Sequence, residues 1–506
     1  MKISLLNRQR TERGLRLWPV GLVLFLAFIA ALVTAGSVFY AAWDLLGARG
    51  LKAEPRIDSK TLFDLVKLSF GVVAGAGALV ALIVAYRRQR VDEDGALREA
   101  TRLHTERFTA AVTQLGDQSP AVRLGGVHSL AGLADDAPTR DLRQTCIDVL
   151  CAYLRLPYIA ETDLPDDDAA ARHAYVANRE VRHTIIRLIR DHLRLEERNP
   201  HSWQGHHFDF TEVVFDGGDF TDVRFTTARL PDGSVQSTSA IFRDAVFSGG
   251  TVDFRDARFS GGTVDFRRAE FSGSTVDFRR AEFSGSTVDF RDARFSRDMV
   301  DFDGAVFSGG TVDFRVSVFS GGTVDFGRAE FSGSTVDFRV ASFSGGTVYF
   351  QGARFSGGTV YFHDAAFTGS RVDFGDAAFS GGTVDFHDAA FSGGTVDFRG
   401  AAFSGGTVDF RLTEFLGGTV DFRSAKFSGG TVYFRDVEFV GGMICFRDVE
   451  FSGGAVDFRG AVFSGGAVDI SDEHVSNATV LEDPFEHPPA GLVLSPNFAG
   501  RSPSPE

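Results

Sequence analysis

Three features of the sequence indicate a membrane-anchored chain with an α-helical N-terminal part and a C-terminal β-solenoid. A 12-residue unit repeats through the second half of the chain, with Phe at two of its positions. Two long apolar segments without charged residues lie at 18–43 and 68–86. Between these segments and the repeat, apolar residues follow the spacing of amphipathic helices. The features predict two transmembrane helices, a helical cap and a wound β-structure.

The first apolar segment, 18–43, begins and ends with Trp, as membrane-spanning helices often do at the two interfaces. A cleaved signal peptide is the alternative for this segment, but 26 uncharged residues are long for one and no distinct small-residue cleavage site follows. The second segment, 68–86, is followed at once by "RRQR". Positive-inside counting predicts a cytoplasmic segment at 1–17, an external loop at 44–67 and a cytoplasmic chain after 86, although five basic residues in the loop reduce the margin.

Residues 87–199 are predicted to form a cytoplasmic helical domain. Leu103, Phe108, Val112 and Leu115 recur at helical spacing, and Gly116 is a stop signal. Ser119 and Pro120 indicate the start of a second helix, and "TRDLRQTCIDVLCAYLRL" and "EVRHTIIRLIRDHLRL" read as a third and a fourth. We expect these helices to cover the N-terminal end of the solenoid, where Phe side chains and strand edges need protection.

The repeat runs from Ala240 through 20 units without insertion or deletion, and its two Phe columns hold 38 of the 51 Phe residues. Self-similarity at a short fixed period is typical of a solenoid, in which each unit packs only against its neighbours. In one unit, Val252 and Phe254 point to one side of a strand and Asp253 to the other. The Gly-rich "SGGT" between two strand pieces is typical of a corner, since Gly adopts positive φ readily. The unit therefore predicts two short strands with Phe inside.

Before the regular units, Phe210, Phe215, Phe220, Phe225 and Leu230 are spaced by five. With these residues the chain resembles a pentapeptide-repeat protein, and the later units read as two pentapeptides plus two extra residues. The segments "RFTAAVTQLGDQSPAVRLGGVHSLAGLADD" and "DVLCAYLR" resemble the helical part that precedes such repeats in membrane-anchored bacterial members. The resemblance implies a right-handed, four-sided β-helix at 208–475.

One coil of the four-sided β-helix takes 24 residues, or two units, and a flattened coil of 12 residues is the alternative. The five-residue units at 208–230 should have the same cross-section as the later units, which favours a coil of 24 residues. The Pro-rich segment 476–506 has no helical or strand period, and we expect it to cap the last coil briefly and then to be disordered.

Charge and Cys content limit the function classes. The formal net charge is −15, with +8 in residues 1–90 and −23 in the remainder, which disfavours direct nucleic-acid binding by the repeat. The chain has only three Cys residues, and Cys146 and Cys151 sit five apart on one predicted helix. This spacing predicts neither a disulfide framework nor a zinc-binding Cys pair. The lack of predicted disulfides is typical of a protein in a reducing compartment.

The outward positions of the repeat are the candidate surface. Asp follows Val in 15 of the 19 units from Asp253 to Asp469, and Arg stands two residues later in most of them. We interpret these positions as a solvated face with compensating charge, and a charge-patterned docking surface is the sharper alternative. Exceptions at the Asp position are Tyr349, Tyr361 and Tyr433, exceptions at the Arg position include His363 and His387, and a separate group before the first strand is His201, His206 and His207.

No catalytic, cofactor-binding or metal-binding residue is predicted. His363 and His387, 24 residues apart, would stack in adjacent coils, but no Cys or carboxylate at a ligand spacing completes a metal site in the sequence. His201, His206 and His207 are interpreted as loop or cap residues. The Ser of each "FSGG" repeats around the rod as a corner residue, whereas a nucleophile needs one asymmetric pocket.

The resemblance and the charge pattern lead to two functional hypotheses. The first is a membrane-tethered, non-catalytic scaffold or interaction module at the bacterial plasma membrane, bound to the bilayer through two helices and to an unknown cytoplasmic protein. The sequence predicts no particular oligomeric state for it. The second is a DNA mimic that modulates a topoisomerase, as some pentapeptide-repeat proteins do. Alternation of Asp with Arg and the predicted membrane anchor favour the first hypothesis.

Overall fold

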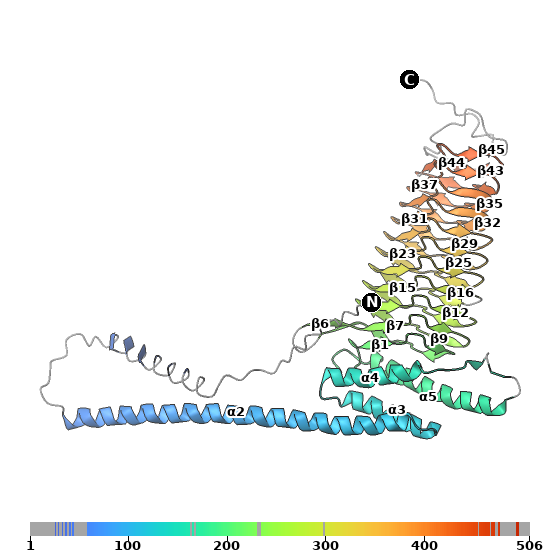
Figure 1. The fold of residues 1–506 in the computed structure, drawn as a ribbon. Helices are drawn as coiled ribbons and strands as arrows, with labels where there is room; N and C mark the ends of the chain where they lie inside the picture. The colour runs from blue at the N-terminus through green and yellow to red at the C-terminus, as the bar shows by residue number, and fades with distance from the viewer. Residues whose placement is uncertain are drawn as a thin grey trace, which may run out of the picture. The chain divides into compact units, whose positions relative to one another are not determined.

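The structure is a computed structural model that describes residues 58–161, 164–165, 168–229, 234–296, 299–453, 455–465, 467–470, 474–475 and 492–494, with nine single positions between 26 and 44. The chain divides into two compact units, Met1–Leu103 and His104–Glu506. Figure 1 shows the elements of the second unit, with a column of strands and the short helices at its N-terminal end.

A single helix, α2 (Ser59–Leu115), contains the second predicted membrane span. It begins inside the predicted external loop 44–67 and continues from 68–86 into the predicted helical domain without interruption, so residues 59–67 are helical instead of a loop. The first predicted span, 18–43, lies largely outside the described residues. In the part of the chain that the structure describes, no helix combines the length and the apolar character that a bilayer crossing requires.

Three more helices follow α2: α3 (Pro120–Asp135), α4 (Arg140–Leu154) and α5 (Ala169–Arg194). The end of α2 at Leu115 and the start of α3 at Pro120 confirm the predicted stop and start signals. The Ser119 side chain makes no capping hydrogen bond, whereas Thr139 accepts one from the Leu142 N–H and begins α4. The fourth helix begins already at Ala169, where the Asp168 side chain caps it.

The helices close the N-terminal end of the solenoid with side chains that bind its exposed backbone groups. The Gln144 amide donates to the His207 carbonyl at 2.8 Å and accepts the His207 N–H at 3.0 Å. Arg182, only 4% exposed, donates to the Val214 carbonyl at 2.7 Å, and Arg194 donates to the Thr221 carbonyl at 2.7 Å. Unpaired strand edges are templates for unwanted pairing, so these contacts confirm the predicted protective role of the helices.

The solenoid has four faces, each a ladder of parallel strands, and the chain visits them in order once per coil. Face 1 consists of β1 (His207–Asp209), β7 (Ser239–Ile241), β11 (Thr263–Asp265), β15 (Thr287–Asp289), β19 (Thr311–Asp313), β23 (Thr335–Asp337), β27 (Thr359–Tyr361), β31 (Thr383–Asp385), β34 (Thr407–Asp409), β37 (Thr431–Tyr433) and β41 (Ala455–Asp457). Face 2 consists of β2 (Val214–Phe215), β8 (Val246–Phe247), β12 (Glu270–Ser272), β16 (Arg294–Ser296), β20 (Val318–Phe319), β24 (Ser342–Phe343), β28 (Ala366–Phe367), the first parts of β32 (Ala390–Asp397) and β35 (Glu414–Asp421), β38 (Glu438–Phe439) and β42 (Val462–Phe463).

Face 3 shares β32 and β35 with face 2, because these two strands run across the corner. Its members are β3 (Gly218–Asp219), β9 (Thr251–Asp253), β13 (Thr275–Asp277), β17 (Met299–Asp301), β21 (Thr323–Asp325), β25 (Thr347–Tyr349), β29 (Arg371–Asp373), the last parts of β32 and β35, β39 (Met443–Cys445), β43 (Ala467–Ile470) and β45 (Leu492–Leu494). Face 4 consists of β4 (Arg224–Phe225), β10 (Arg258–Ser260), β14 (Glu282–Ser284), β18 (Val306–Ser308), β22 (Glu330–Ser332), β26 (Arg354–Phe355), β30 (Ala378–Phe379), β33 (Ala402–Phe403), β36 (Lys426–Phe427), β40 (Glu450–Phe451) and β44 (His474–Val475).

The strand register settles the length of one coil. On face 1, Val264 pairs with Val288, and on face 4, Phe259 pairs with Phe283. Each pair is separated by 24 residues in the sequence, so the 24-residue coil is confirmed and the 12-residue alternative is wrong. Four faces per coil also confirm the four-sided cross-section.

Three strands depart from the regular course at the ends of the array. After β4 the chain leaves the coil as an antiparallel hairpin of β5 (Thr227–Arg229) and β6 (Val235–Ser237), so the pentapeptide spacing does not continue past Phe225. Leu230 lies outside the described residues. At the other end β45 pairs with β43, so this part of the segment predicted to be disordered is a strand.

The two extra residues of each regular unit lie at a corner and leave the Phe columns aligned. Phe215 and Phe220 are five apart and their counterparts Phe247 and Phe254 are seven apart, yet the rings stack at 5.1 and 4.9 Å. Gly250 stands at this corner with φ +71°, and a Cβ there would lie 2.5 Å from the Asp216 carbonyl oxygen. Glycine is therefore required where a corner with the two extra residues packs against the corner of the preceding coil that lacks them.

The interior of the solenoid is filled by Phe rings. Phe266 is fully buried and stacks on Phe290 at 4.7 Å between centroids, while Phe278 on the opposite face approaches it edge-on at 6.1 Å. Both arrangements are favourable for aromatic pairs. Burial of each ring is worth about 1.5–3 kcal/mol relative to exposure, so the Phe columns provide the main stabilisation of the coil.

Candidate functional site: an aspartate–arginine ladder and its histidine break

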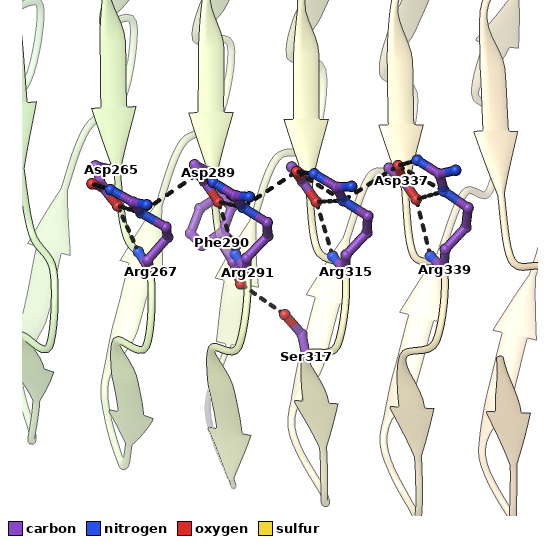
Figure 2. Close-up of polar contacts among 10 residues, drawn as sticks. Asp265, Arg267, Asp289, Phe290, Arg291, Arg315, Ser317, Asp337 and Arg339 are labelled. Atoms are coloured by element: carbon purple, nitrogen blue, oxygen red, sulfur yellow. Dashed lines mark hydrogen bonds and ion pairs between the residues drawn. The ribbon is translucent and has the colours of Figure 1, made fainter. Parts of the chain in front are cut away.

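On faces 1 and 3 an Asp at the end of a strand organises the turn that follows. The Asp289 Oδ1 accepts the backbone N–H of Arg291 at 3.1 Å, which is the hydrogen bond of an Asx-turn. The same carboxylate accepts the Arg291 side chain through Nε at 2.9 Å and Nη2 at 2.6 Å. Figure 2 shows four such pairs in successive coils of face 1. Each Asp therefore fixes both the backbone and the guanidinium of the residue two positions later.

On face 1, successive rungs from Asp265 to Arg339 are joined into a ladder. The Arg291 Nε lies 3.6 Å from Asp313 Oδ2 of the next coil, as the dashed lines between rungs in Figure 2 show. The Arg291 side chain is 38% exposed, whereas the Asp289 side chain is 10% exposed. The predicted ladders with compensating charge are therefore present, but the carboxylates lie beneath the guanidinium groups instead of facing solvent equally. The same Arg–Asp pair recurs at Asp253, Asp265, Asp277, Asp313, Asp337, Asp397, Asp409, Asp421 and Asp457.

Pairing with arginine lowers the pKa of a ladder carboxylate, as Asp265 shows. Burial by itself would raise the pKa of Asp265, but hydrogen bonds from Arg267 and Arg243 overcome this effect and lower its pKa to about 2. The pKa of Arg267 is raised in turn, mainly by its hydrogen bond to Asp265. The Asp265–Arg267 pair is therefore charged at every physiological pH.

Face 3 loses its arginines in the middle of the array, where Asp303, Gly327, Gln351 and Gly375 occupy the Arg position. Asp301 there keeps the turn hydrogen bond, from the Asp303 N–H at 2.9 Å, and Arg279 Nε of the preceding coil lies 3.6 Å away. Burial raises the pKa of Asp301, with the neighbouring carboxylates of Asp325 and Asp277 adding to the effect. This stretch of face 3 therefore holds buried carboxylates without the bidentate partner found elsewhere.

Face 1 loses its arginines at two successive rungs, where His363 and His387 stand. The structure confirms that the two side chains stack in adjacent coils, with ring centroids 5.1 Å apart and Nδ1 atoms 3.2 Å apart. Asp388 Oδ2 lies 3.1 Å from the Nδ1 of His387. The sequence interpretation set this pair aside for want of a carboxylate, but Asp388 follows His387 directly and the turn brings it to the imidazole. Among the described residues, these three form the group of His, Cys, Asp and Glu side chains whose geometry suits a metal ion.

Two of the tyrosines at the Asp position, Tyr361 and Tyr433, contact the ladder through their rings. The guanidinium of Arg339 lies 5.4 Å from the ring centroid of Tyr361, and that of Arg435 lies 5.2 Å from the ring centroid of Tyr433. At these distances a cation–π interaction replaces the ion pair. The tyrosines thus continue the ladder with a neutral rung.

A buried cluster around Asp216, which the sequence interpretation missed, joins the helices to the first coil. The Asp216 carboxylate accepts the Tyr158 hydroxyl at 2.6 Å and the Tyr175 hydroxyl at 2.7 Å, and His183 Nε2 lies 3.3 Å away. Arg179 Nε lies 3.2 Å from the same carboxylate. Burial opposes ionisation of Asp216, but these hydrogen bonds lower its pKa. The partners come from separate parts of the chain, so no local spacing signals the cluster.

Of the histidines predicted to precede the first strand, His206 and His207 belong to the helix–solenoid junction, and His207 is the first residue of β1. His206 is 2% exposed, and its Nδ1 lies 3.0 Å from the Gln144 side-chain oxygen. Burial lowers the pKa of His206 to about 3, with Arg140 and Arg143 adding to the effect. His207 contacts Ser239 of the next coil at 2.6 Å. These contacts confirm that His206 and His207 lie at the cap.

Comparison with known proteins agrees with the repeat. Residues 266–318 match the family model described as pentapeptide repeats (9 copies). No curated protein and no solved structure matches the chain. The matched residues lie on all four faces of the solenoid. The family match and the four-sided β-solenoid together support a pentapeptide-repeat protein.

Proposed function

We propose that this protein is a non-catalytic scaffold whose outer solenoid faces bind a protein partner. The observation that supports it best is the set of half-exposed guanidinium groups that recur in successive coils of face 1 and near both ends of face 3. Because Phe fills the interior, a ligand meets the solenoid on its outer surface. Successive rungs lie about 4.8 Å apart, the spacing of paired strands, so an extended partner surface can contact several of them at once.

The chemistry of the ladder suits recognition of carboxylates and backbone carbonyls. Each Asp holds one edge of its Arg, and the rest of the guanidinium still has N–H donors to offer. The ion pair also orders the Arg side chain before binding, which reduces the entropy that association costs. A protein partner with acidic or carbonyl groups along one edge fits this arrangement.

Membrane tethering through 18–43 and 68–86 is a further part of the proposal. Large apolar side chains along α2 are open to the surroundings: Leu68 is 69% exposed, Phe70 is 70% exposed and Leu82 is 69% exposed. Soluble proteins rarely leave such side chains together on one segment without a covering surface. A bilayer would cover them, with the solenoid on the cytoplasmic side of a bacterial plasma membrane.

Fractionation of cells that express the full-length chain tests the tether. We expect the protein in the membrane fraction after washing with alkaline carbonate, and release only by detergent. A matched variant with Leu68, Phe70 and Leu82 changed to Ser should lose part of this retention. Recovery of the unchanged protein in the aqueous fraction would rule out the tether while leaving the docking proposal in place.

Affinity capture tests the docking surface. The full-length protein is compared with a face 1 variant (Arg291→Gln, Arg315→Gln and Arg339→Gln) and with a matched face 3 variant (Arg279→Gln, Arg399→Gln and Arg423→Gln). Gln is chosen because Gln351 occupies this position naturally. We expect one face variant to lose a partner that the unchanged protein and the other variant retain. If both variants, with unchanged thermal unfolding, capture the same proteins as the original, the ladder is not the docking surface.

The paired carboxylates weigh against the DNA-mimic hypothesis. Mimicry needs exposed negative charge, whereas the Asp289 side chain is 10% exposed beneath a guanidinium group. A gyrase supercoiling assay with residues 104–506 distinguishes the hypotheses. We expect no inhibition at micromolar protein.

A further inference from the structure

We propose that His363, His387 and Asp388 form a binding site for a divalent first-row transition-metal ion such as Zn²⁺ on face 1 of the solenoid. One ligand atom of each residue lies within 4.8 Å of the other two. The set combines two imidazole nitrogens with one carboxylate oxygen, and these are the ligand types that Zn²⁺ takes in proteins. This proposal is independent of the docking function.

The distances suit one ion held by all three side chains. The two Nδ1 atoms are 3.2 Å apart, and Asp388 Oδ2 is 3.1 Å from the Nδ1 of His387. With Zn–N bonds of about 2.0–2.1 Å, neighbouring ligands of a tetrahedral ion are roughly 3.3 Å apart. Two of the three ligand separations are therefore close to the value that the ion requires, and the third, between His363 and Asp388, is within 4.8 Å.

Two contacts prepare the imidazoles for this role. His363 Nε2 lies 3.2 Å from Asp364 Oδ2, and a neutral imidazole that donates its Nε2 hydrogen there directs the Nδ1 lone pair toward His387. Ligand histidines commonly donate their other nitrogen to a carboxylate in this way. The backbone N–H of His387 donates to Asp385 Oδ1 at 3.0 Å, which fixes the second His on its turn. Strand pairing of Tyr361 with Asp385 sets the two turns one coil apart.

Local charge favours a cation at this position. Elsewhere on face 1 an Arg stands where these two His residues stand and neutralises the carboxylates of its own and the next coil. Here His363 and His387 replace those guanidinium groups, so Asp385 has no arginine on its own rung. A divalent ion would restore the balance that the ladder has in neighbouring coils.

The proposed site is open to the outside. The His387 side chain is 28% exposed and that of Asp388 is 41% exposed. Three protein ligands leave a fourth position of a tetrahedral ion for water or for a side chain of another molecule. The exposure of the site also allows the ion to enter without unfolding of the coil.

Titration of Zn²⁺ into the metal-free full-length protein, in competition with a chromogenic chelator, tests the site. The key variants are His363→Arg and His387→Arg, which restore the residue of the neighbouring rungs and should therefore keep the fold. Asp388→Gly removes the third ligand, and Asp376→Gly is its matched control at the same turn position of another face, since both residues have φ +56°. Other histidines of the chain bind equally in all variants, so the differences between variants report this site.

We expect one equivalent of Zn²⁺ to be lost in His363→Arg and in His387→Arg. Asp388→Gly should weaken this equivalent at least 10-fold, Asp364→Gly should weaken it about 10–100-fold as loss of an outer-shell partner does, and Asp376→Gly should leave it unchanged. Substitution by Co²⁺ should give a visible absorption band that the two Arg variants lack. Equal stoichiometry and affinity in the unchanged protein and in folded His363→Arg and His387→Arg would overturn the proposal and leave a hydrogen-bonded His pair.

Discussion

At the scale of single residues, one turn position recurs every 12 residues in the left-handed region of backbone space. Asp is frequent there, as at Asp256 with φ +58°, and Gly takes the position at Gly304 with φ +67°. Val316 and Val340 adopt φ +63° and φ +60° at the same position, although a β-branched side chain is strained in this conformation. The turn is thus imposed by the stacking of coils and not by the residue that occupies it.

Replacement of Val340 by Gly should stabilise the protein. Val340 is 55% exposed, so little burial is lost, and relief of the backbone strain should raise the free energy of unfolding by about 1 kcal/mol. The reverse change, Gly352→Val, is the control: its Cβ would meet the Arg328 Cγ at 3.6 Å, an ordinary contact, so its cost would come from the backbone. Denaturant unfolding measures both, and a loss of stability in Val340→Gly would contradict the strain argument.

The two kinds of ladder carboxylate should respond in opposite directions to neutralisation. Asp265→Asn removes the charged partner of Arg267 and Arg243 and should lower the free energy of unfolding at pH 7 by about 1.5–3 kcal/mol. Because its folded pKa of about 2 lies below the unfolded value of about 3.9, the contribution of Asp265 is present above pH 4 and is lost as the pH falls toward 2. Denaturant unfolding at pH 7, 4 and 3 should therefore show the difference between Asp265→Asn and the unchanged protein shrinking.

Asp301→Asn is the counterpart, since its amide oxygen still accepts the Asp303 N–H while the buried charge is removed. A raised pKa means that ionisation of Asp301 destabilises the folded state as the pH rises through that pKa. The variant should therefore be at least as stable as the unchanged protein at pH 7. If Asp265→Asn and Asp301→Asn lowered the free energy of unfolding equally, the arginine partner would not decide whether neutralisation stabilises or destabilises the protein.

At the scale of elements, the repeat predicts the interior well and the exterior contacts only in part. The Phe columns follow from the fixed period, because stacked coils place equal positions side by side. The 24-residue coil is favoured by continuity with the five-residue spacing before it, and the stacking of His363 on His387 depends on that coil length. The Asp216 cluster could not be predicted, since α5 and the first coil bring its members together in three dimensions. Asp388 was not predicted as a metal ligand, because its carboxylate reaches His387 only through a turn in which Asp388 has φ +56°. The presence of an Asp in the sequence does not by itself predict this backbone conformation.

Deletion of one whole coil should be tolerated and should leave every later residue on its face. Removal of 327–350 takes out 24 residues, including residue 349, which pairs with Asp325 in the unchanged protein. Asp373 should then take its place as the strand partner of Asp325. In this variant, Asp325→Cys and Asp373→Cys should form a disulfide, because neighbouring strands are about 4.8 Å apart. Mass spectrometry under non-reducing conditions detects the bond.

Two controls accompany the coil deletion. In the undeleted chain the same two Cys substitutions lie two coils apart, at about 9.6 Å, which is too far for a disulfide. In a chain that lacks only 327–338, half a coil is gone and the later units move to the opposite face, so no bond should form. A disulfide in the half-coil variant would contradict the 24-residue period.

At the scale of the whole solenoid, stability is distributed along a stack in which each coil contacts only the coils before and after it. Phe338 stacks on Phe314 at 4.8 Å and on Phe362 at 4.9 Å, and the same pattern repeats in both directions. A one-dimensional arrangement of this kind has an energy that is close to a sum of neighbouring contacts. Damage in the middle should therefore remain near the damaged coil.

Phe338→Ala should cost about 3–5 kcal/mol, the range for truncation of a buried Phe. Hydrogen exchange followed by mass spectrometry should show faster exchange in β23, β27 and the strands that pair with them, while β1 and the helix α4 keep the protection of the unchanged protein. Phe242→Ala is the control near the helical cap, where Phe242 stacks on Phe210 and Phe266 and the loss should concentrate around β7. Uniform acceleration across all strands in Phe338→Ala would mean that the stack opens as one cooperative body, because only long-range coupling can carry the loss of one ring to coils that do not touch it.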